Sequence, residues 1–273
     1  MKVFDAHIHG HDTVPAPEDL LRKMDLAGVY GGCIFSNRPT EYNTVYGTGF
    51  DDRLREVLDW CKGYEDRLFP VLWIHPHEKD ALSRVHIAAD NGVAAFKIIC
   101  KHFYVYDAEC MELIREIACV GKPIFFHSGI LWDSFSIEVG SIYNRPLNWE
   151  YLLKVPGLRF SMGHCAWPWY DECLALFSEF EAAKRVGPTA EMYLDITPGA
   201  PEMDRRDMFA KLFKRPGAAD YVFFGSDQGA ESYNTERVQG MITFNNSIYD
   251  EIGLNQTARQ KLYGDNLLRF LGK

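Results

Sequence analysis

Eight short apolar segments recur at nearly regular intervals along the chain, and this spacing constrains the fold more than any other feature. Each segment is rich in β-branched or aromatic residues and is bounded by Gly, Pro or charged stretches, a pattern typical of buried strands. The seven steps from His9 to Asp227 cover 218 residues, about 31 residues each, which is the length of a β-α-β unit. The predicted strands span residues 3–9, 29–36, 68–75, 93–99, 123–127, 158–164, 191–197 and 221–227.

Helical patterns separate these strands, as where Leu20, Met24 and Ala27 repeat at helical spacing. Alternating strands and helices form either an open doubly wound sheet or a closed barrel. Polar residues suited to binding a ligand follow the first, fifth, sixth and eighth strands, and only a closed barrel brings those strand ends around one axis. We therefore predict an α/β fold, a (β/α)8 TIM barrel forming a single domain over residues 1–273, with extra C-terminal helices.

Composition narrows the class of protein. With 47% hydrophobic and 25% charged residues, the chain can bury one sizeable core. Its net charge of -9 argues against nucleic acid or an anionic membrane surface as a partner. No apolar run approaches the roughly 20 residues of a membrane span, and the N-terminal residues do not resemble a signal peptide. Seven cysteines without a Cys-x-x-Cys motif fit a reduced, cytoplasmic protein.

Five ligand-type side chains stand at predicted strand ends. His7 and His9 are separated by one residue on the first strand, so both project from the same face. His127, His164 and Asp227 each end a later hydrophobic strand. Each polar group buried at one barrel rim would need its own partner, whereas a single cation satisfies them together. The pattern predicts a metal site, because imidazole and carboxylate are preferred ligands of zinc.

These motifs resemble the amidohydrolase superfamily of metal-dependent hydrolases over nearly the full chain. The resemblance rests on Asp-Ala-His-Ile-His at residues 5–9, on His127 and His164, and on Gly-Ser-Asp at 225–227. Gly-His-Cys-Ala-Trp-Pro-Trp at 163–169 and Tyr-Gly-Asp-Asn-Leu-Leu-Arg-Phe at 263–270 are similar to the type-two branch, which includes the aminocarboxymuconate-semialdehyde decarboxylase group.

The resemblance implies roles for the same five residues. His7, His9, His127 and Asp227 would hold one divalent metal, with zinc expected and manganese, iron or a second ion as alternatives. Asp227 would also accept a proton, and His164 would bind the water or stabilise charge on the substrate, so both are candidate catalytic residues. Asp5 shares the strand face of the two histidines and is expected behind the metal rather than on it.

Lys97, on the predicted fourth strand, bears on whether the site holds one metal ion or two. Two-metal members of the superfamily carry a carboxylated lysine on this strand that bridges the ions. A buried lysine is costly unless it is paired or modified. Lys97 is therefore predicted to bridge a second metal, to pair with Asp227 or another carboxylate, or to bind a substrate carboxylate.

Three long loops, at residues 37–50, 128–146 and 198–205, are expected to build the pocket at the barrel rim. Arginine among aromatic residues suggests a pocket for a small organic acid, with Arg38 and Trp167 as the candidate substrate-binding residues. His11, His75 and His77 are expected on the surface or behind the site. The other candidate rim residues are Tyr42, Tyr46, Trp132, Arg145, Trp169 and Arg205.

The predicted function is hydrolysis of a small, carboxylate-bearing molecule, with metal-activated water attacking an amide, ester or lactone. Carbon-carbon lyase chemistry, decarboxylation above all, is the first alternative, because decarboxylases of the branch share nearly the same ligands. A barrel that binds a metal or ligand without turnover is the second. A homodimer is possible through the helix at 170–181, whose Leu174, Phe177 and Phe180 suggest an exposed apolar face.

Overall fold

A computed structural model describes residues 1–10, 14–132 and 140–273. Every predicted strand is present, and the first seven are one to three residues shorter than predicted. The eighth predicted strand is split in two. The strands are β1 (Phe4–His9), β2 (Gly31–Phe35), β3 (Leu68–Trp73), β4 (Ala95–Ile98), β5 (Ile124–Phe126), β6 (Arg159–Met162), β7 (Glu191–Asp195), β8 (Val222–Phe223) and β9 (Gln228–Gly229).

The strands form one parallel sheet that closes on itself. Its order is β8-β7-β6-β5-β4-β3-β2-β1-β9, so β1 to β8 follow one another in sequence order and β9 lies on the other side of β1. β8 pairs with β7, and β9, four residues further on, pairs with β1. Between them the Ala6 amide donates to the Phe224 carbonyl oxygen (2.9 Å) and the Asp227 amide to the His7 carbonyl oxygen (2.9 Å). β8 and β9 are therefore two parts of one eighth strand, and the predicted (β/α)8 barrel is confirmed.

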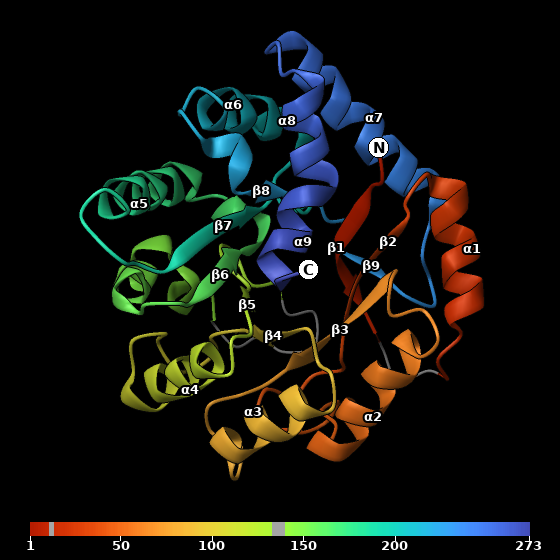
Figure 1. Ribbon diagram of the computed structural model, residues 1–273, viewed down its shortest axis with the longest axis vertical. Helices are drawn as coiled ribbons and strands as arrows, with labels where there is room; N and C mark the ends of the chain where they lie inside the picture. Colours follow the sequence, from red (N-terminus) through yellow and green to blue (C-terminus); the bar gives the residue numbers. More distant parts are fainter. Residues whose placement is uncertain (11–13, 133–139) are drawn as a thin grey trace.

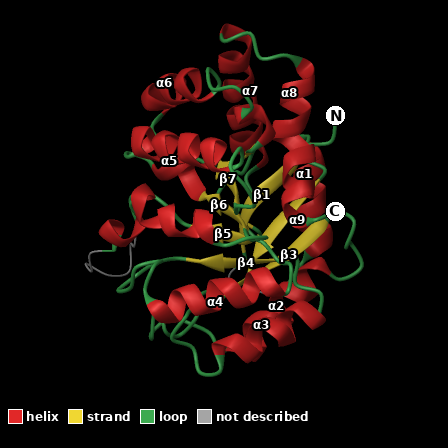
Figure 2. Cartoon of the chain, turned by 60° about the vertical axis from the view of Figure 1, so that its left-hand side comes forward, coloured by secondary structure: helices red, strands yellow, loops and turns green. Residues whose placement is uncertain are grey.

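Helices surround the strands, as Figures 1 and 2 show. The connection between β5 and β6 departs from the regular pattern, because two 3₁₀ segments, Ser141–Asn144 and Pro146–Lys154, replace a helix there. A short π-helical turn, Lys261–Asp265, joins the extra C-terminal helices α8 and α9, which confirm that part of the prediction. The helices are α1 (Pro17–Ala27), α2 (Phe50–Cys61), α3 (Ala81–Asp90), α4 (Ala108–Cys119), α5 (Tyr170–Ala183), α6 (Glu202–Leu212), α7 (Thr235–Glu251), α8 (Gln256–Gln260) and α9 (Asn266–Leu271).

α9 closes the end of the barrel at which the strands begin. In Figure 1 it lies across the middle of the strand ring. The Phe270 ring packs against Phe125, Tyr193 and Phe223, with ring centres 4.8, 5.0 and 5.3 Å away. These rings belong to the smaller apolar cluster inside the barrel, and the larger cluster fills the space between strands and helices. The carboxyl ends of the strands are therefore the end that is left for a pocket.

The apolar face of α5 is buried in the core. The prediction that this face is exposed and available to a dimer partner is therefore wrong. Leu174, Phe177 and Phe180 belong to the larger core cluster. Phe180 packs edge-on against Tyr221, with ring centres 5.0 Å apart. The helical spacing that suggested an exposed stripe marks the side of α5 that packs on the barrel. These three side chains are therefore not an exposed apolar face, and a homodimer stays a prediction.

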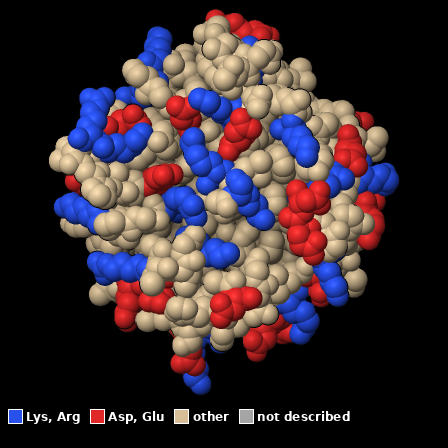
Figure 3. Space-filling view, in the orientation of Figure 1, with Lys and Arg blue, Asp and Glu red and all other residues tan. Residues whose placement is uncertain are grey.

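The molecular surface is mixed in charge where Figure 3 shows it. Lys and Arg side chains are interspersed with Asp and Glu side chains over the face on which α9 lies. All seven cysteines are free thiols. Within the described ranges, none of the helices combines the length and the apolar character that crossing a membrane requires.

Candidate metal centre

A pocket of about 280 Å³ opens at the carboxyl ends of the barrel strands. This is the end of such barrels at which loops build active sites. The structure brings together, on the walls of this one pocket, the eight residues that the sequence predicts as metal ligands, catalytic groups or substrate-binding groups. They are His7, His9, Arg38, Lys97, His127, His164, Trp167 and Asp227.

His7 and His9 reach the pocket through a bulge in β1. The pairing of β1 with β2 shifts register between Asp5 and Ile8, so β1 carries one extra residue there. The extra residue interrupts the alternation of side chains, and Asp5 lies on the opposite face of the strand from the two imidazoles. Its carboxylate instead accepts a hydrogen bond from the Tyr233 hydroxyl (3.0 Å). The expectation that Asp5 shares the face of the histidines is wrong, because strict alternation does not survive a bulge.

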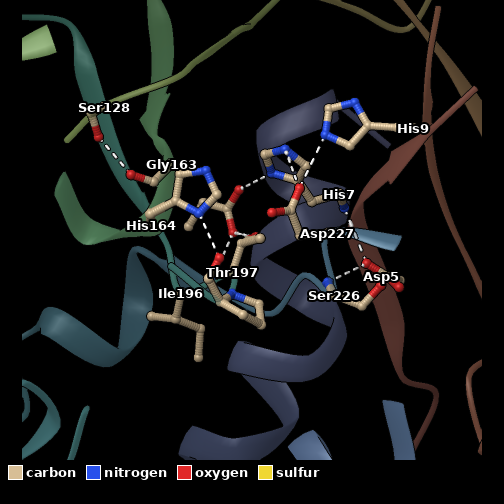
Figure 4. A network of polar contacts seen from close by, with 12 residues as sticks. Asp5, His7, His9, Ser128, Gly163, His164, Ile196, Thr197, Ser226 and Asp227 are labelled. Carbon is tan, nitrogen blue, oxygen red and sulfur yellow. Dashed lines mark hydrogen bonds and ion pairs between the residues drawn. The ribbon is translucent and has the colours of Figure 1, made fainter. Parts of the chain in front are cut away.

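Asp227 enters the pocket where the eighth strand is interrupted. β8 ends at Phe223 and β9 begins at Gln228. Between them Asp227 adopts a left-handed backbone conformation (φ 58°), which aspartate tolerates better than most residues. Its Oδ1 lies 3.1 Å from His9 Nε2 and 3.6 Å from His7 Nε2, as Figure 4 shows.

A further carboxylate, which the sequence analysis did not assign, orients His7. Asp195 is the last residue of β7, and its buried Oδ2 accepts a hydrogen bond from His7 Nδ1 (2.7 Å). Asp195 also accepts hydrogen bonds from the Thr197 amide (2.9 Å) and the Thr197 hydroxyl. Burial acts to raise the pKa of Asp195, but His7 and these hydrogen bonds hold it below its usual value. The sequence did contain a signal for Asp195, because, like Asp227, it is a carboxylate near the end of a predicted hydrophobic strand.

The donor atoms fit a divalent cation. One atom each from His7, His9 and Asp227 lies within 4.8 Å of the other two. Zinc bonds of about 2.0–2.2 Å in a tetrahedral site place two ligand atoms about 3.3–3.6 Å apart, close to both distances from Asp227. Burial and the Lys97 ammonium lower the pKa of His7 to about 4, so its ring is neutral at pH 7. With Nδ1 donating to Asp195, Nε2 offers the lone pair that a metal requires.

His127, the predicted fourth ligand, lies in the pocket wall just after β5, outside this three-residue group. Its Nε2 donates to the Ile130 carbonyl oxygen (3.1 Å), and its ring centre is 5.0 Å from that of His164. Burial, His164 and Lys97 together lower the pKa of His127 well below its usual value. The ring is therefore neutral with its free lone pair on Nδ1, and its place in the coordination sphere stays a prediction.

His164 lies beside the metal ligands rather than among them. It follows β6 with a left-handed backbone (φ 58°), and its ring centre is 5.5 Å from that of His7. Its Nδ1 donates to the Pro198 carbonyl oxygen (2.8 Å), so Nε2 is the nitrogen left for water or substrate. The loop after β7 thus fixes the orientation of the imidazole that the sequence predicts to be catalytic.

Gly199→Ala is expected to displace His164. A Cβ at this position would lie 2.8–2.9 Å from Cβ, Cγ and Nδ1 of His164, closer than real Cβ atoms approach other heavy atoms. Misplacing a catalytic group by about 1 Å costs on the order of a hundredfold in rate, so kcat/KM should fall by that order while metal affinity is retained. Gly187→Ala is the control, since a Cβ there meets nothing within 4 Å. Equal kinetics for the two variants would contradict this role of Gly199.

Lys97 extends from β4 into the pocket, and its ammonium lies 4.9 Å from the centre of the Phe35 ring. Burial lowers the pKa of Lys97 to about 8, although Asp195 and Asp227 act in the opposite direction. In the described part of the chain, Lys97 forms no ion pair with Asp227, which was one of the predicted alternatives. The amine therefore remains available for a substrate carboxylate or for modification.

The rim residues predicted from the sequence divide into two groups. Arg38, Tyr42, Trp132 and Trp167 line the pocket. Arg205 instead lies in the core, where it donates to the Ile196 carbonyl oxygen (2.6 Å) and to Asn245 Oδ1 (3.0 Å), so its prediction as a pocket residue is wrong. An arginine in a rim loop can equally point inward to satisfy buried acceptors. Three further residues that lie outside the pocket are Tyr46, Arg145 and Trp169.

The remaining histidines agree with their predicted places where the structure describes them. His75 is buried behind the pocket, where burial and nearby positive groups lower its pKa to about 3. His77 is exposed and its Nε2 lies 3.0 Å from Glu109. His11 lies outside the described residues, as does the 133–139 part of the long loop after β5.

Solved structures share this architecture over the whole chain. A "probable 2-pyrone-4,6-dicarboxylic acid hydrolase" from Acinetobacter baumannii is 12% identical, with 100% of both chains covered and a TM-score of 0.65. A 2,6-dihydroxybenzoate decarboxylase from Rhizobium is 12% identical, with 100% of this chain and 99% of that chain covered (TM-score 0.64). An amidohydrolase 2 from Bifidobacterium longum subsp. infantis is 15% identical, with the same coverage and a TM-score of 0.58.

The chain shares its barrel fold with these hydrolase and amidohydrolase structures. The resemblance that the sequence motifs indicated is thereby confirmed for the fold. No protein-family model and no curated protein matches the sequence. What this amidohydrolase-like barrel does must therefore be argued from the pocket itself.

Proposed function

We propose that the protein is a metal-dependent hydrolase of the amidohydrolase superfamily, type-two branch, acting on a small carboxylate-bearing molecule. The observation that carries the proposal is the convergence of His7, His9 and Asp227, from the two strands that close the barrel, at the floor of one pocket. The hydrolase, decarboxylase and amidohydrolase structures with this fold support it.

The pocket residues supply the parts that hydrolysis requires. A bound zinc ion lowers the pKa of water to about 7 and polarises a carbonyl group. Asp227 is charged at pH 7, because the nearby histidines hold its pKa well below the usual range despite its burial, and a charged carboxylate at this position can accept the proton of the attacking water. The Nε2 of His164 can accept a proton, and once protonated it can donate to the oxygen on which negative charge develops. Asp195 keeps the His7 proton on Nδ1.

Metal analysis tests the proposal directly. Protein purified without chelator is expected to contain about one equivalent of divalent ion, with zinc as the expected metal and manganese or iron as alternatives. Chelation should abolish turnover of ester, lactone or amide substrates, and added metal should restore it. Two equivalents, with added mass on the Lys97 amine, would contradict the single-ion site. Tight ligand binding with no turnover across a broad substrate panel would contradict the enzyme itself.

The charge and shape of the pocket support an organic acid as substrate. Arg38 and Lys97 place two cationic side chains on the wall, and Tyr42, Trp73 and Trp167 provide flat apolar surfaces. Guanidinium groups bind carboxylates through paired hydrogen bonds. Arg38→Ala is expected to raise KM for acidic substrates about tenfold to a hundredfold while kcat changes less, consistent with the loss of a charged hydrogen bond. Unchanged kinetics on every acidic substrate would exclude Arg38 from substrate binding.

Decarboxylation is the second candidate, favoured by the 2,6-dihydroxybenzoate decarboxylase that shares the fold. In that reaction the pocket would bind the substrate carboxylate that departs as carbon dioxide, and His164 or Asp227 would return a proton to carbon. Two measurements on the same turnover separate the candidates. Incorporation of ¹⁸O from labelled water into the product indicates hydrolysis, and release of carbon dioxide with deuterium incorporated from D2O at carbon indicates decarboxylation.

A further inference from the structure

Asp5 connects the two strands that carry the metal ligands. Its Oδ1 accepts hydrogen bonds from the backbone amides of His7 (3.1 Å) and Ser226 (2.8 Å), and its Oδ2 accepts one from the Tyr233 hydroxyl (3.0 Å). The carboxylate has no exposed surface. Figure 4 shows Asp5 and Ser226 beside the strands, away from the cluster formed by the two imidazoles and Asp227.

These contacts fill a gap in the barrel ladder. β1 carries a bulge between Asp5 and Ile8, and the eighth strand is interrupted between Phe223 and Gln228. Around the gap the backbones pair directly, since the amides of Ala6 and Asp227 both bond across the two strands. At Ser226 the Asp5 carboxylate takes the place of a backbone carbonyl as acceptor. A bulge redirects side chains, and here the β1 bulge directs His7, and the break in the eighth strand directs Asp227, into the pocket.

We propose that Asp5 and Tyr233 are positioning residues that hold the β1 bulge and the interrupted eighth strand in register and thereby set the separation between the imidazoles and Asp227. This inference rests on the proposed metal site and adds a pair of residues outside the pocket to it. The Tyr233 hydroxyl matters because a buried carboxylate oxygen that loses its donor is left without compensation. The carboxylate then shifts toward another donor, and the Ser226 amide next to Asp227 moves with it.

The test compares two Tyr→Phe substitutions that remove one hydroxyl from a buried ring. Tyr233→Phe removes the Asp5 contact. Tyr249→Phe is the matched control, because the buried Tyr249 hydroxyl has no hydrogen-bond partner in the part of the chain that the structure describes. Both variants and the wild type are stripped of metal and titrated with Co²⁺. Affinity is measured by competition with a chromophoric chelator, and the visible spectrum of the bound Co²⁺ reports coordination geometry.

Tyr233→Phe is expected to bind Co²⁺ about threefold to tenfold more weakly than Tyr249→Phe, less than the tenfold to hundredfold cost of losing a partner that bonds a ligand directly. Its Co²⁺ spectrum should shift in position or intensity, a change that lower stability alone does not produce. If Tyr233→Phe does not fold, the near-isosteric Asp5→Asn is measured in the same way, with the same expected direction.

The possible failures are distinguishable. If the wild-type protein binds neither Co²⁺ nor Zn²⁺ near stoichiometry, the proposed function is wrong and this inference falls with it. If the wild type binds Co²⁺ and Tyr233→Phe matches Tyr249→Phe within twofold, with an unchanged spectrum, the metal site stands and the positioning role is overturned.

Discussion

Asp227→Asn is expected to lower kcat/KM by at least about a thousandfold, the range over which positioned acid–base groups act. Asparagine preserves the shape of the side chain but removes the charge that favours a cation and the group that takes the proton. It also alters the contacts at 3.1 and 3.6 Å that align His9 and His7. Metal content after dialysis and steady-state kinetics on any substrate that the wild type turns over are the two measurements.

Asp90→Asn provides the matched control, since Asp90 is an exposed residue at the end of α3 that does not line the pocket. It should retain metal content and rate. An Asp227→Asn variant that kept both would show that the carboxylate neither binds the ion nor accepts a proton. Loss of rate with metal retained would assign Asp227 to proton transfer alone.

Glu78→Ala is expected to produce the largest loss of stability, about 3–5 kcal/mol, because it leaves a buried guanidinium without its partner. Both oxygens of Glu78 bond Arg53 Nη2 (2.8 and 2.9 Å), and the two side chains are 0% and 1% exposed. Arg84 Nη1 adds a third contact at 2.7 Å, and the His75 amide a fourth at 3.0 Å. Chemical denaturation monitored by tryptophan fluorescence measures the loss.

Glu109→Ala is the companion variant, because Glu109 also forms an ion pair, with His77, but is 72% exposed. Exposed pairs contribute little, about 0–1 kcal/mol, so its stability should stay near that of the wild type. Equal stability of the two variants would mean that the buried pair is replaceable by solvent.

The buried pair is also linked to the pocket wall. The Arg53 guanidinium donates to the Thr48 carbonyl oxygen, and the Thr48 amide donates to the Arg38 carbonyl oxygen. Glu78→Ala should therefore also loosen the pocket wall that carries Arg38.

The sequence predicted the barrel because its signal is repeated. Eight hydrophobic segments at regular spacing limit the topology, and errors at the ends of single strands do not change it. The candidate site residues were visible for the same reason, since His9, His127, His164 and Asp227 each end a predicted strand. Positions that follow from regular secondary structure were therefore predictable.

Features that break the regular pattern could not be predicted from the sequence. The bulge in β1 places Asp5 on the unexpected face, and strict alternation gives no warning of an extra residue. Asp195 stands at a strand end like Asp227, yet its role depends on a contact with His7, 188 residues away. Arg205 and Trp167 were both predicted in rim loops, but Arg205 lies in α6 and turns into the core, whereas Trp167 lines the pocket. Loop conformation decides such cases, and periodicity carries no information about it.

The C-terminal helix covers the end of the barrel at which the strands begin. Phe270 and the rings around it fill that end in the described part of the chain, so we expect substrate and product to use the pocket at the opposite end. Product then leaves by the route through which substrate enters, and the two compete for the same pocket. We therefore expect product inhibition, and an analogue of the released acid should act as a competitive inhibitor.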